Sequence, residues 1–249
     1  MKALILAAGV GSRLRPLTDS TPKALIPVGG VPMLERAALR LRDAGATSLV
    51  VNAHHHAQAV ADFCADLSRR LGIPVSVSRE DDVLLDTGGA IRKAAPLLRG
   101  PEPFYVHNAD VLTDLDLTAL FAEHTKSGAL VTLSVRERES ARAYLFDPAG
   151  RFVGHDDRTT GRATWIKGPV PGARRLPFDG IHVISPALLD KLTETGVFSI
   201  TKTYLRLAAA GSDIRAFRAD RWSWHDVGSP EKLAAARAWA EAPPPPSRT

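Results

Sequence analysis

The sequence has little cysteine and few aromatic residues. Of its 249 residues, one is a cysteine, Cys64, and 6% are aromatic. A single cysteine cannot form an internal disulfide and cannot by itself make a zinc site, so we expect a reducing compartment and a cytoplasmic protein. Because Cys64 lies near Phe63 and Leu67 on an expected helix, we predict that its thiol is buried and unreactive.

Long hydrophobic runs are also missing. The longest, Ala3 to Val10, is far shorter than the roughly 20 residues that a membrane-spanning helix requires. It is also too short for the apolar part of a signal peptide, because Gly9 and Gly11 interrupt it and Arg13 follows. We therefore expect no membrane partner and interpret the run as a buried strand that enters a loop.

No strong excess of one charge is present. Lys and Arg number 32 against 27 Asp and Glu, a formal net charge of +5, and the basic residues cluster no further than pairs such as Arg69-Arg70. A nucleic-acid-binding protein usually shows a clustered basic stripe with interleaved aromatic residues. The composition therefore argues against a nucleic-acid partner and suits a small anionic ligand.

Strand-like and helix-like segments alternate over the first half of the chain. The expected strands are Lys2–Leu6, Ser48–Val51, Pro74–Ser78, Phe104–His107 and Ala129–Val135, and the expected helices are Val31–Ala44, Ala57–Leu71, Gly89–Leu98 and Leu117–Lys126. This rhythm predicts an α/β fold with three layers, in which helices cover both faces of a mostly parallel, Rossmann-like sheet.

The rhythm changes in the second half. Between about residues 136 and 182, turn signals separate short segments, which predicts a small antiparallel hairpin insertion over one edge of the sheet. Further expected elements are the helices Pro186–Glu194, Thr201–Ala210 and Pro230–Glu241 and the strand Asp213–Arg218. We expect one domain over residues 1–241, followed by a disordered, Pro-rich tail at 242–249.

The loop after the first strand carries the strongest chemical signal. Gly9 and Gly11 let a ligand approach the backbone, whose free N–H groups favour an anion. Arg13 and Lys23 add positive charge suited to phosphate oxygens. The loop is neither a Walker loop, which needs Gly-Lys-[Ser/Thr], nor a dinucleotide fingerprint, because Leu14 occupies the third glycine position. A tight turn with solvated arginines is the alternative.

Two aspartates stand where strands are expected to end. Asp110 follows the fourth strand, and Asp226 lies between a strand and the start of the last helix. Carboxylates that converge from distant segments suit Mg²⁺, which prefers oxygen ligands. The alternative for each is a helix cap or a turn residue.

Two further clusters admit functional and structural interpretations. The backbone N–H groups of Thr87-Gly88-Gly89 precede a helix and form a second candidate anion or sugar site, although Thr87 can also be a simple cap. The side chains of His54-His55-His56 point in different directions and cannot all face one ion. We therefore expect a structural or rim role for these histidines.

Several motifs together resemble one enzyme family, the sugar-1-phosphate nucleotidylyltransferases. They are LAAGVGSRLRPLT at residues 6–18, TPKAL at 21–25, DTGGAI at 86–91, HNAD at 107–110, FDGI at 178–181 and WHDVGS at 224–229. The compact length is similar to that of N-acetylmuramate-1-phosphate uridylyltransferases and of heptose- or mannose-1-phosphate guanylyltransferases. Larger members append a β-helix, which we do not expect here.

The resemblance implies a role for each matching residue. The implied set comprises Arg13 on the β- and γ-phosphates and Lys23 on the α-phosphate; Leu6, Ala7, Ala8, Gly9, Gly11, Glu80 and Gly88 on the nucleotide; Asn108, Lys167 and Gly180 on the sugar phosphate; and Asp110 and Asp226 on Mg²⁺ or Mn²⁺. Two motifs depart from the family. The chain reads Asn-Ala-Asp where relatives read Asn-Gly-Asp, and Ile-Lys167-Gly-Pro where they read Glu-Lys-Pro.

The implied reaction condenses a nucleoside triphosphate with a sugar 1-phosphate and releases pyrophosphate. The motif resemblance favours UTP with an amino-sugar phosphate. The Glu80 carboxylate can accept from an N–H of uracil, but it can equally pair with guanine, which presents two adjacent donors. The alternatives are a mannose- or heptose-1-phosphate guanylyltransferase, a cytidylyltransferase acting on an alcohol phosphate, a molybdopterin nucleotidylyltransferase and a non-catalytic ligand-sensing domain. We expect a monomer or a homodimer.

Overall fold

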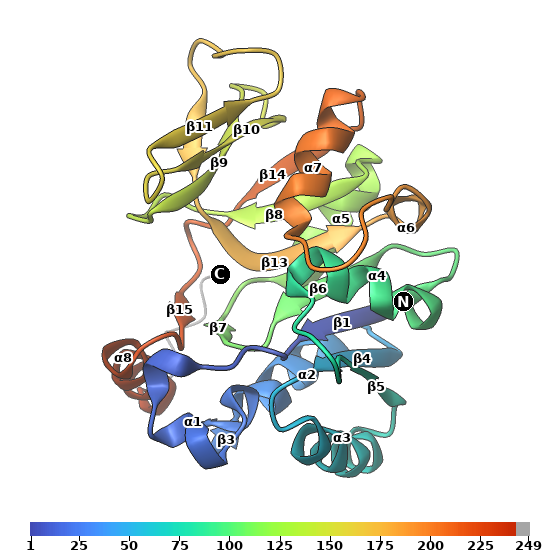
Figure 1. Ribbon diagram of the computed structural model, residues 1–249, viewed down its shortest axis with the longest axis vertical. Coiled ribbons are helices and arrows are strands. Elements are labelled where there is room, and N and C mark those ends of the chain that lie inside the picture. The colour runs from blue at the N-terminus through green and yellow to red at the C-terminus, as the bar shows by residue number, and fades with distance from the viewer. Residues whose placement is uncertain (243–249) are drawn as a thin grey trace.

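A seven-stranded sheet forms the centre of the computed structural model, which describes residues 1–242 (Figure 1). Its strand order is β14-β8-β13-β6-β1-β4-β5, and all strands are parallel except β13, which runs antiparallel to both neighbours. The strands are β1 Lys2–Leu6, β4 Ser48–Ala53, β5 Val75–Arg79, β6 Phe104–Asn108, β8 Val131–Val135, β13 Phe178–Ile184 and β14 Ile214–Arg218.

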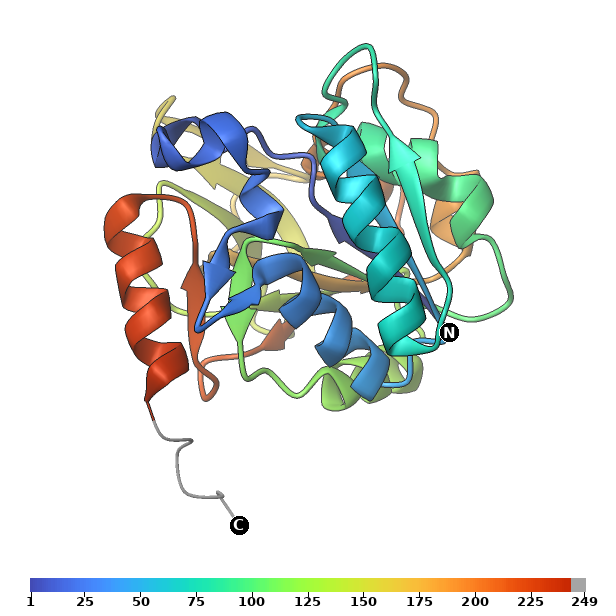
Figure 2. The same cartoon turned by 90° about the horizontal axis from the view of Figure 1, so that it is seen from below.

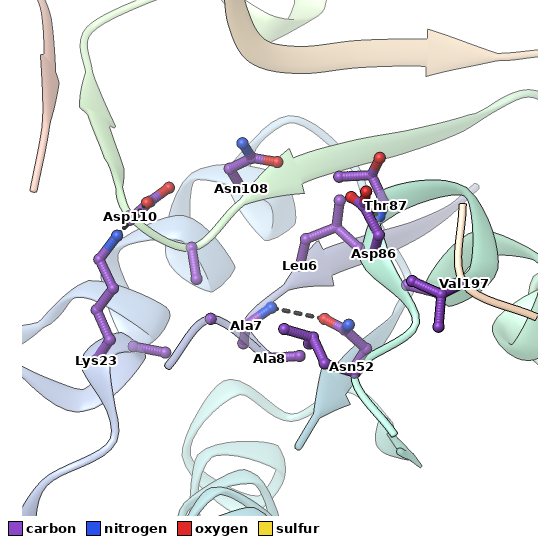
Figure 3. Close-up of a pocket in the computed structure, with 15 residues that line it drawn as sticks. Leu6, Ala7, Ala8, Lys23, Asn52, Asp86, Thr87, Asn108, Asp110 and Val197 are labelled. Carbon is purple, nitrogen blue, oxygen red and sulfur yellow. Dashed lines mark hydrogen bonds and ion pairs between the residues drawn. The ribbon is translucent and has the colours of Figure 1, made fainter. Parts of the chain in front are cut away.

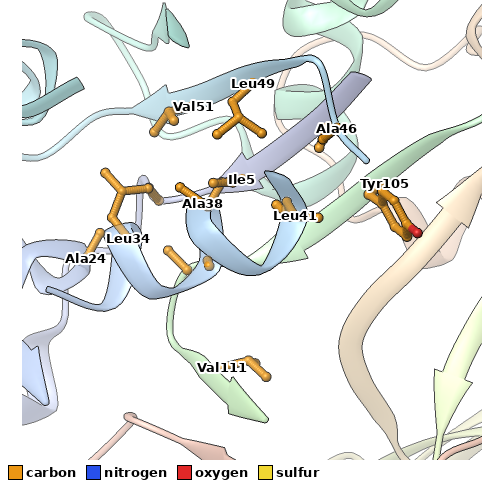
Figure 4. Packing of buried hydrophobic residues seen from close by; sticks show 14 of the residues in the cluster. Ile5, Ala24, Leu34, Ala38, Leu41, Ala46, Leu49, Val51, Tyr105 and Val111 are labelled. Atoms are coloured by element: carbon orange, nitrogen blue, oxygen red, sulfur yellow. The ribbon is translucent and has the colours of Figure 1, made fainter. Parts of the chain in front are cut away.

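Helices cover both faces of this sheet, as the sequence predicts. On one face lie α2 (Met33–Asp43), α3 (Ala57–Leu71) and α5 (Leu117–Ser127); on the other lie α4 (Asp86–Leu98) and α7 (Ile200–Ala209). Alternate residues of β1 divide between the two layers. Ala3 and Ile5 pack on the first side, where Figure 4 shows Ile5, and Leu4 packs on the second. The predicted fold class is confirmed.

The hairpin region forms a second, four-stranded antiparallel sheet beyond α7 (Figure 1). Its order is β11-β10-β9-β12, and Tyr144 and Phe152 join it to the apolar cluster of α7. The sheet ends earlier than expected, because residues 178–184 form a strand of the central sheet instead. The strands are β9 Arg142–Phe146, β10 Phe152–Asp157, β11 Arg162–Trp165 and β12 Arg174–Leu176.

One expected helix is much shorter than the pattern suggests. Instead of Pro186–Glu194, the chain forms only α6, Ala187–Asp190. Glu194 accepts two hydrogen bonds from Arg206 of α7, at 2.8 and 2.9 Å. The segment after α6 is therefore held against α7 and does not extend α6.

The C-terminal helix packs against the N-terminal loop (Figure 2). This helix, α8 (Pro230–Glu241), follows β15 (Trp224–Asp226), which pairs antiparallel with β7 (Val111–Thr113). Buried Leu14, Leu112, Val227 and Leu233 form a third apolar cluster there. Ser229 caps α8 by accepting from the Lys232 N–H at 3.4 Å. The remaining elements are α1 Leu17–Ser20, β2 Pro27–Val28 and β3 Val31–Pro32, with 3₁₀ turns at Ser12–Leu14 and Lys23–Leu25.

Two expectations concern the ends of the chain and membranes. Most of the expected Pro-rich tail, residues 243–249, lies outside the described residues. Within residues 1–242, no helix is both long and apolar enough to cross a membrane.

Three buried histidines make the stability of the fold depend on pH. Burial lowers the pKa of His107 and His124 to about 4 and that of His182 to about 3. Between pH 6.5 and 4 the unfolded chain therefore binds protons that the native state does not. We predict that the free energy of unfolding is highest above pH 6.5 and falls toward pH 4, by up to roughly 1.4 kcal/mol per pH unit for each histidine.

The variant His124→Gln isolates one of these contributions. His124 hydrogen-bonds to Thr132 and Ser185 at 2.9 and 3.0 Å, and a glutamine amide can serve both without titrating. Urea denaturation from pH 4 to 8 should show a shallower acid loss for this variant, and His55→Gln, at a half-exposed position, is the matched control. Equal profiles for wild type and His124→Gln would contradict the prediction.

Candidate active site

A cavity of about 450 Å³ opens at the carboxyl ends of β1, β4 and β6 (Figure 3). Parallel sheets place ligands at this edge, because the loops that follow adjacent strands meet there. Its walls come from six segments: the first loop, the 3₁₀ turn at Lys23–Leu25, the end of β4, the start of α4 with the residues before it, the loop after β6 and the segment before α7. The lining residues include Leu6, Ala7, Ala8, Gly9, Lys23, Asn52, Asp86, Thr87, Asn108, Asp110 and Val197.

The first loop presents unpaired backbone donors beside this cavity. In the described part of the chain, no hydrogen bond is donated by the backbone N–H groups of residues 8–11. Gly11 has a φ of +68°, and a Cβ there would lie 2.8 Å from Thr18 and 3.1 Å from Lys23. Glycine is therefore required at this position, as the loop needs both the left-handed backbone and the close approach. An anion cradle remains the interpretation of this loop.

Glu80 is buried and hydrogen-bonded within the protein. Its side chain is only 1% exposed. One carboxylate oxygen accepts from Asn52 Nδ2 at 2.7 Å, and the other accepts from the Leu85 N–H at 2.9 Å. Asn52 Oδ1 in turn accepts from the Ala7 N–H at 2.6 Å. The structure thus places Asn52 at the cavity and Glu80 behind it, and the expected contact between Glu80 and a base stays a prediction.

Gly88 does not line the cavity either. Its N–H donates to the Phe198 carbonyl at 2.9 Å, and that of Gly89 donates to the same oxygen at 3.2 Å. In the structure these N–H groups are therefore already paired with the Phe198 carbonyl, and the expected contact between Gly88 and the nucleotide stays a prediction. Asp86, at φ +58°, and Thr87 face the cavity instead. A left-handed backbone is uncommon for a residue other than glycine, and aspartate adopts it more readily than most.

The pairing of β7 with β15 brings the two predicted aspartates together. Asp226 lies opposite Val111, the residue that follows Asp110 in the chain. The Val227 N–H donates to the Asp110 carbonyl at 2.9 Å. Each carboxylate has a lysine partner: Asp110 pairs with Lys23, and Asp226 pairs with Lys232 of α8 at 2.5 Å. The aspartates are 33% and 20% exposed, so both remain accessible from solvent.

Arg13 lies beside the same pair of strands. A Cβ placed on Gly228 would be 2.6 Å from Asp226 Oδ1 and 3.2 Å from Arg13 Nη2. The first loop and the WHDVGS segment are thus in contact although they come from opposite ends of the chain. The structure therefore brings together Arg13, Lys23, Asp110 and Asp226, as expected from the sequence.

Two of the three expected sugar-phosphate residues are also close together. Gly180, at φ +82°, would place a Cβ 2.7 Å from Asn108 Nδ2, so only glycine leaves room for this amide. Lys167 is not brought to the cavity. It lines a separate pocket of about 390 Å³ between the hairpin sheet and β14, together with Arg151 and Arg215. The second sheet carries it there because Ile166 packs on the cluster of α7.

The histidine cluster and the cysteine have structural surroundings. His54 Nδ1 is 2.6 Å from the Glu80 carbonyl oxygen, and His56 forms the left-handed N-cap of α3. Burial raises the pKa of the Cys64 thiol to about 12, as suits an unreactive side chain. Among residues 1–242, no three His, Cys, Asp or Glu side chains are grouped closely enough to hold a metal ion. A metal bound by Asp110 and Asp226 would therefore complete its coordination with water and ligand oxygens.

The family model described as nucleotidyl transferase matches residues 2–145. The N-acetylmuramate alpha-1-phosphate uridylyltransferase of Neisseria meningitidis serogroup B is 36% identical over 251 residues, which cover 97% of this chain and 99% of that protein. The chain belongs to the nucleotidyl transferase family. Its predicted class, sugar-1-phosphate nucleotidyltransferase, agrees with these relatives.

More distant relatives agree in sequence or in fold. A mannose-1-phosphate guanyltransferase of Gibberella zeae is 30% identical over 93% of this chain, which spans 62% of that protein. The crystal structure of HddC from Yersinia pseudotuberculosis complexed with GMP-PN has a TM-score of 0.75 at 20% identity, covering 96% of this chain and 99% of that one. The latter likeness supports the fold alone.

Sequence reasoning missed Asn52 and gave no role to Asp86. A signal for Asn52 was present, since it is a polar residue at the carboxyl end of an otherwise apolar parallel strand, the same placement that singled out Asp110. No local pattern predicts the left-handed backbone of Asp86, because an aspartate in a DTGG run is also typical of a helix cap.

Glu80→Ala tests the buried Glu80–Asn52–Ala7 connection. Removal of the carboxylate leaves the Asn52 amide and the Leu85 N–H without an acceptor, at a cost of roughly 1–3 kcal/mol for each buried group. We predict lower thermal stability and a raised KM for the nucleotide, with a nearly unchanged KM for the sugar phosphate. Asp82→Ala, an exposed carboxylate on the same loop, is the matched control. The connection is refuted if both variants behave alike.

Proposed function

We propose that this nucleotidyl transferase condenses UTP with an amino-sugar 1-phosphate. In the reaction, a phosphate oxygen of the sugar 1-phosphate bonds to the α-phosphorus of UTP, the bond between that phosphorus and the bridging oxygen of the β-phosphate breaks, and pyrophosphate leaves. The products are a UDP-sugar and pyrophosphate. The nucleophile is already anionic at pH 7, so the reaction needs no general base.

One observation carries this proposal: two cations and two carboxylates converge beside a 450 Å³ cavity, which Lys23 and Asp110 line and next to which Asp226 and Arg13 lie. A reaction between two polyanions requires alignment and charge neutralisation more than proton transfer. Lys23 and Arg13 supply positive charge from the first loop, next to the unpaired N–H groups of residues 8–11. Such an arrangement suits the triphosphate, with Lys23 on its α-phosphate and Arg13 on the departing β- and γ-phosphates.

Asp110 and Asp226 would hold Mg²⁺ or Mn²⁺. The donor set fits, because two accessible carboxylates, one on β15 and one directly before β7, match the preference of these ions for a few protein oxygens supplemented by water and phosphate. The lysine partners show that a cation is already favourable at each carboxylate. When bound, the ion supplies Lewis-acid stabilisation of the charge that develops on the phosphoryl oxygens.

The acceptor would lie between the nucleotide and β13. Asn108, against Gly180, offers its amide to the sugar phosphate at the end of β6. Lys167 has no part in this arrangement, because it lines the other pocket. The proposed reaction draws on nucleoside triphosphate in the cytoplasm, and a monomer or a homodimer could perform it.

The buried position of Glu80 bears on the choice of base. A carboxylate at the cavity would have favoured guanine, which presents two adjacent donors. Both oxygens of Glu80 are instead used by Asn52 and Leu85. That weakens the chemical argument for GTP, while the N. meningitidis uridylyltransferase matches this chain over nearly its whole length.

The metal assignment predicts the behaviour of Asp226→Asn. Removal of one carboxylate charge should weaken Mn²⁺ binding and lower kcat by orders of magnitude, with the fold intact. Mn²⁺ titration followed by electron paramagnetic resonance, pyrophosphate release and circular dichroism would measure the three effects. Asp190→Asn is the control, since Asp190 is 66% exposed and pairs with Arg99. A folded Asp226→Asn enzyme with full activity would rule out this metal site.

The base preference is tested by kcat/KM for UTP, GTP, CTP and dTTP with one accepted sugar phosphate. We predict a preference for UTP. A preference for GTP of more than about tenfold, roughly 1.4 kcal/mol of transition-state discrimination, would assign the chain to the guanylyltransferases. Absence of pyrophosphate release with every pair of substrates would instead support a ligand-sensing domain.

A further inference from the structure

A second, smaller cavity of about 220 Å³ lies between the hairpin sheet, β13 and α7. Its lining includes Arg138, Arg142, Tyr144, His155, Phe178 and Thr201 and contains no carboxylate. Two guanidinium groups without an acidic residue in the wall make a cavity that suits an anion.

Arg138 is held on a rigid platform. Its guanidinium carbon lies 4.3 Å from the centre of the Trp224 ring, and Nη2 donates to the Phe178 carbonyl at 3.0 Å. Trp224 is itself fixed, since its Nε1 donates to the Asp179 carbonyl at 2.9 Å. A planar cation stacked on an anchored ring keeps its remaining donors in a fixed direction.

Arg138 is partly desolvated and has no carboxylate of its own. Its Nε is buried without a hydrogen-bond partner, and no ion pair of Arg138 occurs within residues 1–242. The two acids that act electrostatically on Arg138 are both engaged elsewhere: the oxygens of Asp179 accept from Arg136 at 2.8 Å and from Ser134 at 2.9 Å, and Asp226 pairs with Lys232. A partly buried guanidinium without a carboxylate partner costs free energy, and a bound anion would offset that cost.

This cavity adjoins the proposed acceptor position. Phe178, which lines it, lies two residues before Gly180, and Gly180 contacts the Asn108 amide of the main cavity. Tyr144 lies at the other end of this cavity. Burial, with a smaller contribution from the nearby Asp86 carboxylate of the main cavity, raises the pKa of Tyr144 to about 12. A group that extends from a sugar between the two cavities would therefore reach Arg138.

We propose that this second cavity binds a carboxylate carried by the sugar, with Arg138 as the residue that selects acidic acceptors. The inference rests on the proposed function and narrows its substrate class to sugar 1-phosphates with a second acidic group away from the phosphate. Arg142, which pairs with Asp157 and is 69% exposed, contributes a less fixed charge at the rim. A carboxylate accepting from a stacked guanidinium would satisfy donors that the fold leaves open.

A matched pair of acceptors tests this proposal. N-acetylglucosamine 1-phosphate and N-acetylmuramate 1-phosphate differ by one lactyl ether that carries a carboxylate. Binding of each would be measured by calorimetry with Mg²⁺ and a non-hydrolysable UTP analogue, in wild type, Arg138→Gln and Arg69→Gln. Arg69 lies on α3 with 79% exposure and is the control. Turnover with UTP would be followed in parallel.

In wild type we expect the acidic acceptor to bind at least tenfold more tightly than the neutral one. Arg138→Gln should remove this preference by weakening only the acidic acceptor, while Arg69→Gln preserves it. Equal losses for both acceptors, or no preference in wild type, would overturn the proposal. Because binding is measured without turnover, a protein that binds the acceptors selectively but releases no pyrophosphate would refute the proposed function and keep the role of Arg138.

Discussion

The candidate site depends on the pairing of two three-residue strands, β7 and β15. This pairing holds Asp226 beside Asp110 although the two come from distant parts of the chain. Two neighbouring carboxylates repel each other, and the fold offsets the repulsion with one ammonium on each, from Lys23 and Lys232. The short strands are supported by the apolar cluster in which Leu14, Leu112 and Val227 meet α8. Packing of the last helix therefore fixes both the acidic pair and the first loop.

The main cavity and the second, smaller cavity differ in how their polar groups are satisfied. On the nucleotide side, Glu80, Asn52 and the Ala7 N–H form a closed chain of hydrogen bonds, so the amide of Asn52 is held in one orientation. In the second cavity, Arg138 is stacked and oriented, but it forms no ion pair within residues 1–242. A satisfied network defines a fixed recognition surface, whereas an open donor on a fixed platform leaves part of the binding energy to the ligand. The first arrangement suits a constant substrate, and the second suits selection among acceptors.

Local patterns predicted the elements whose stability is local. The bounds of β1, α3 and α8 agree with the sequence prediction because apolar periodicity, Gly72 after α3 and the Ser229 cap act within a few residues. The antiparallel insertion of β13 between β6 and β8 was not predictable in this way, since an apolar strand carries no mark of its direction or its neighbours. The same limit explains Glu80 and Lys167. Burial of Glu80 is decided by Asn52 from another strand, and the place of Lys167 is decided by how the second sheet packs on α7.

Because Lys167 does not line the main cavity, other groups must neutralise the negative charge of the two substrates. Lys23 and Lys232, which pair with the two aspartates, can supply that positive charge. Two polyanions must approach each other at the edge where Asp110 and Asp226 add negative charge of their own. In the structure each aspartate neutralises a lysine, so neither Lys23 nor Lys232 has its full charge to offer. A divalent cation bound by both aspartates would replace both ammonium groups and release them at the place where the phosphates meet. The proposed metal would thus add its own positive charge and free the two lysine ammonium groups to bind phosphate. Such a site can neutralise its substrates without a lysine from the hairpin region.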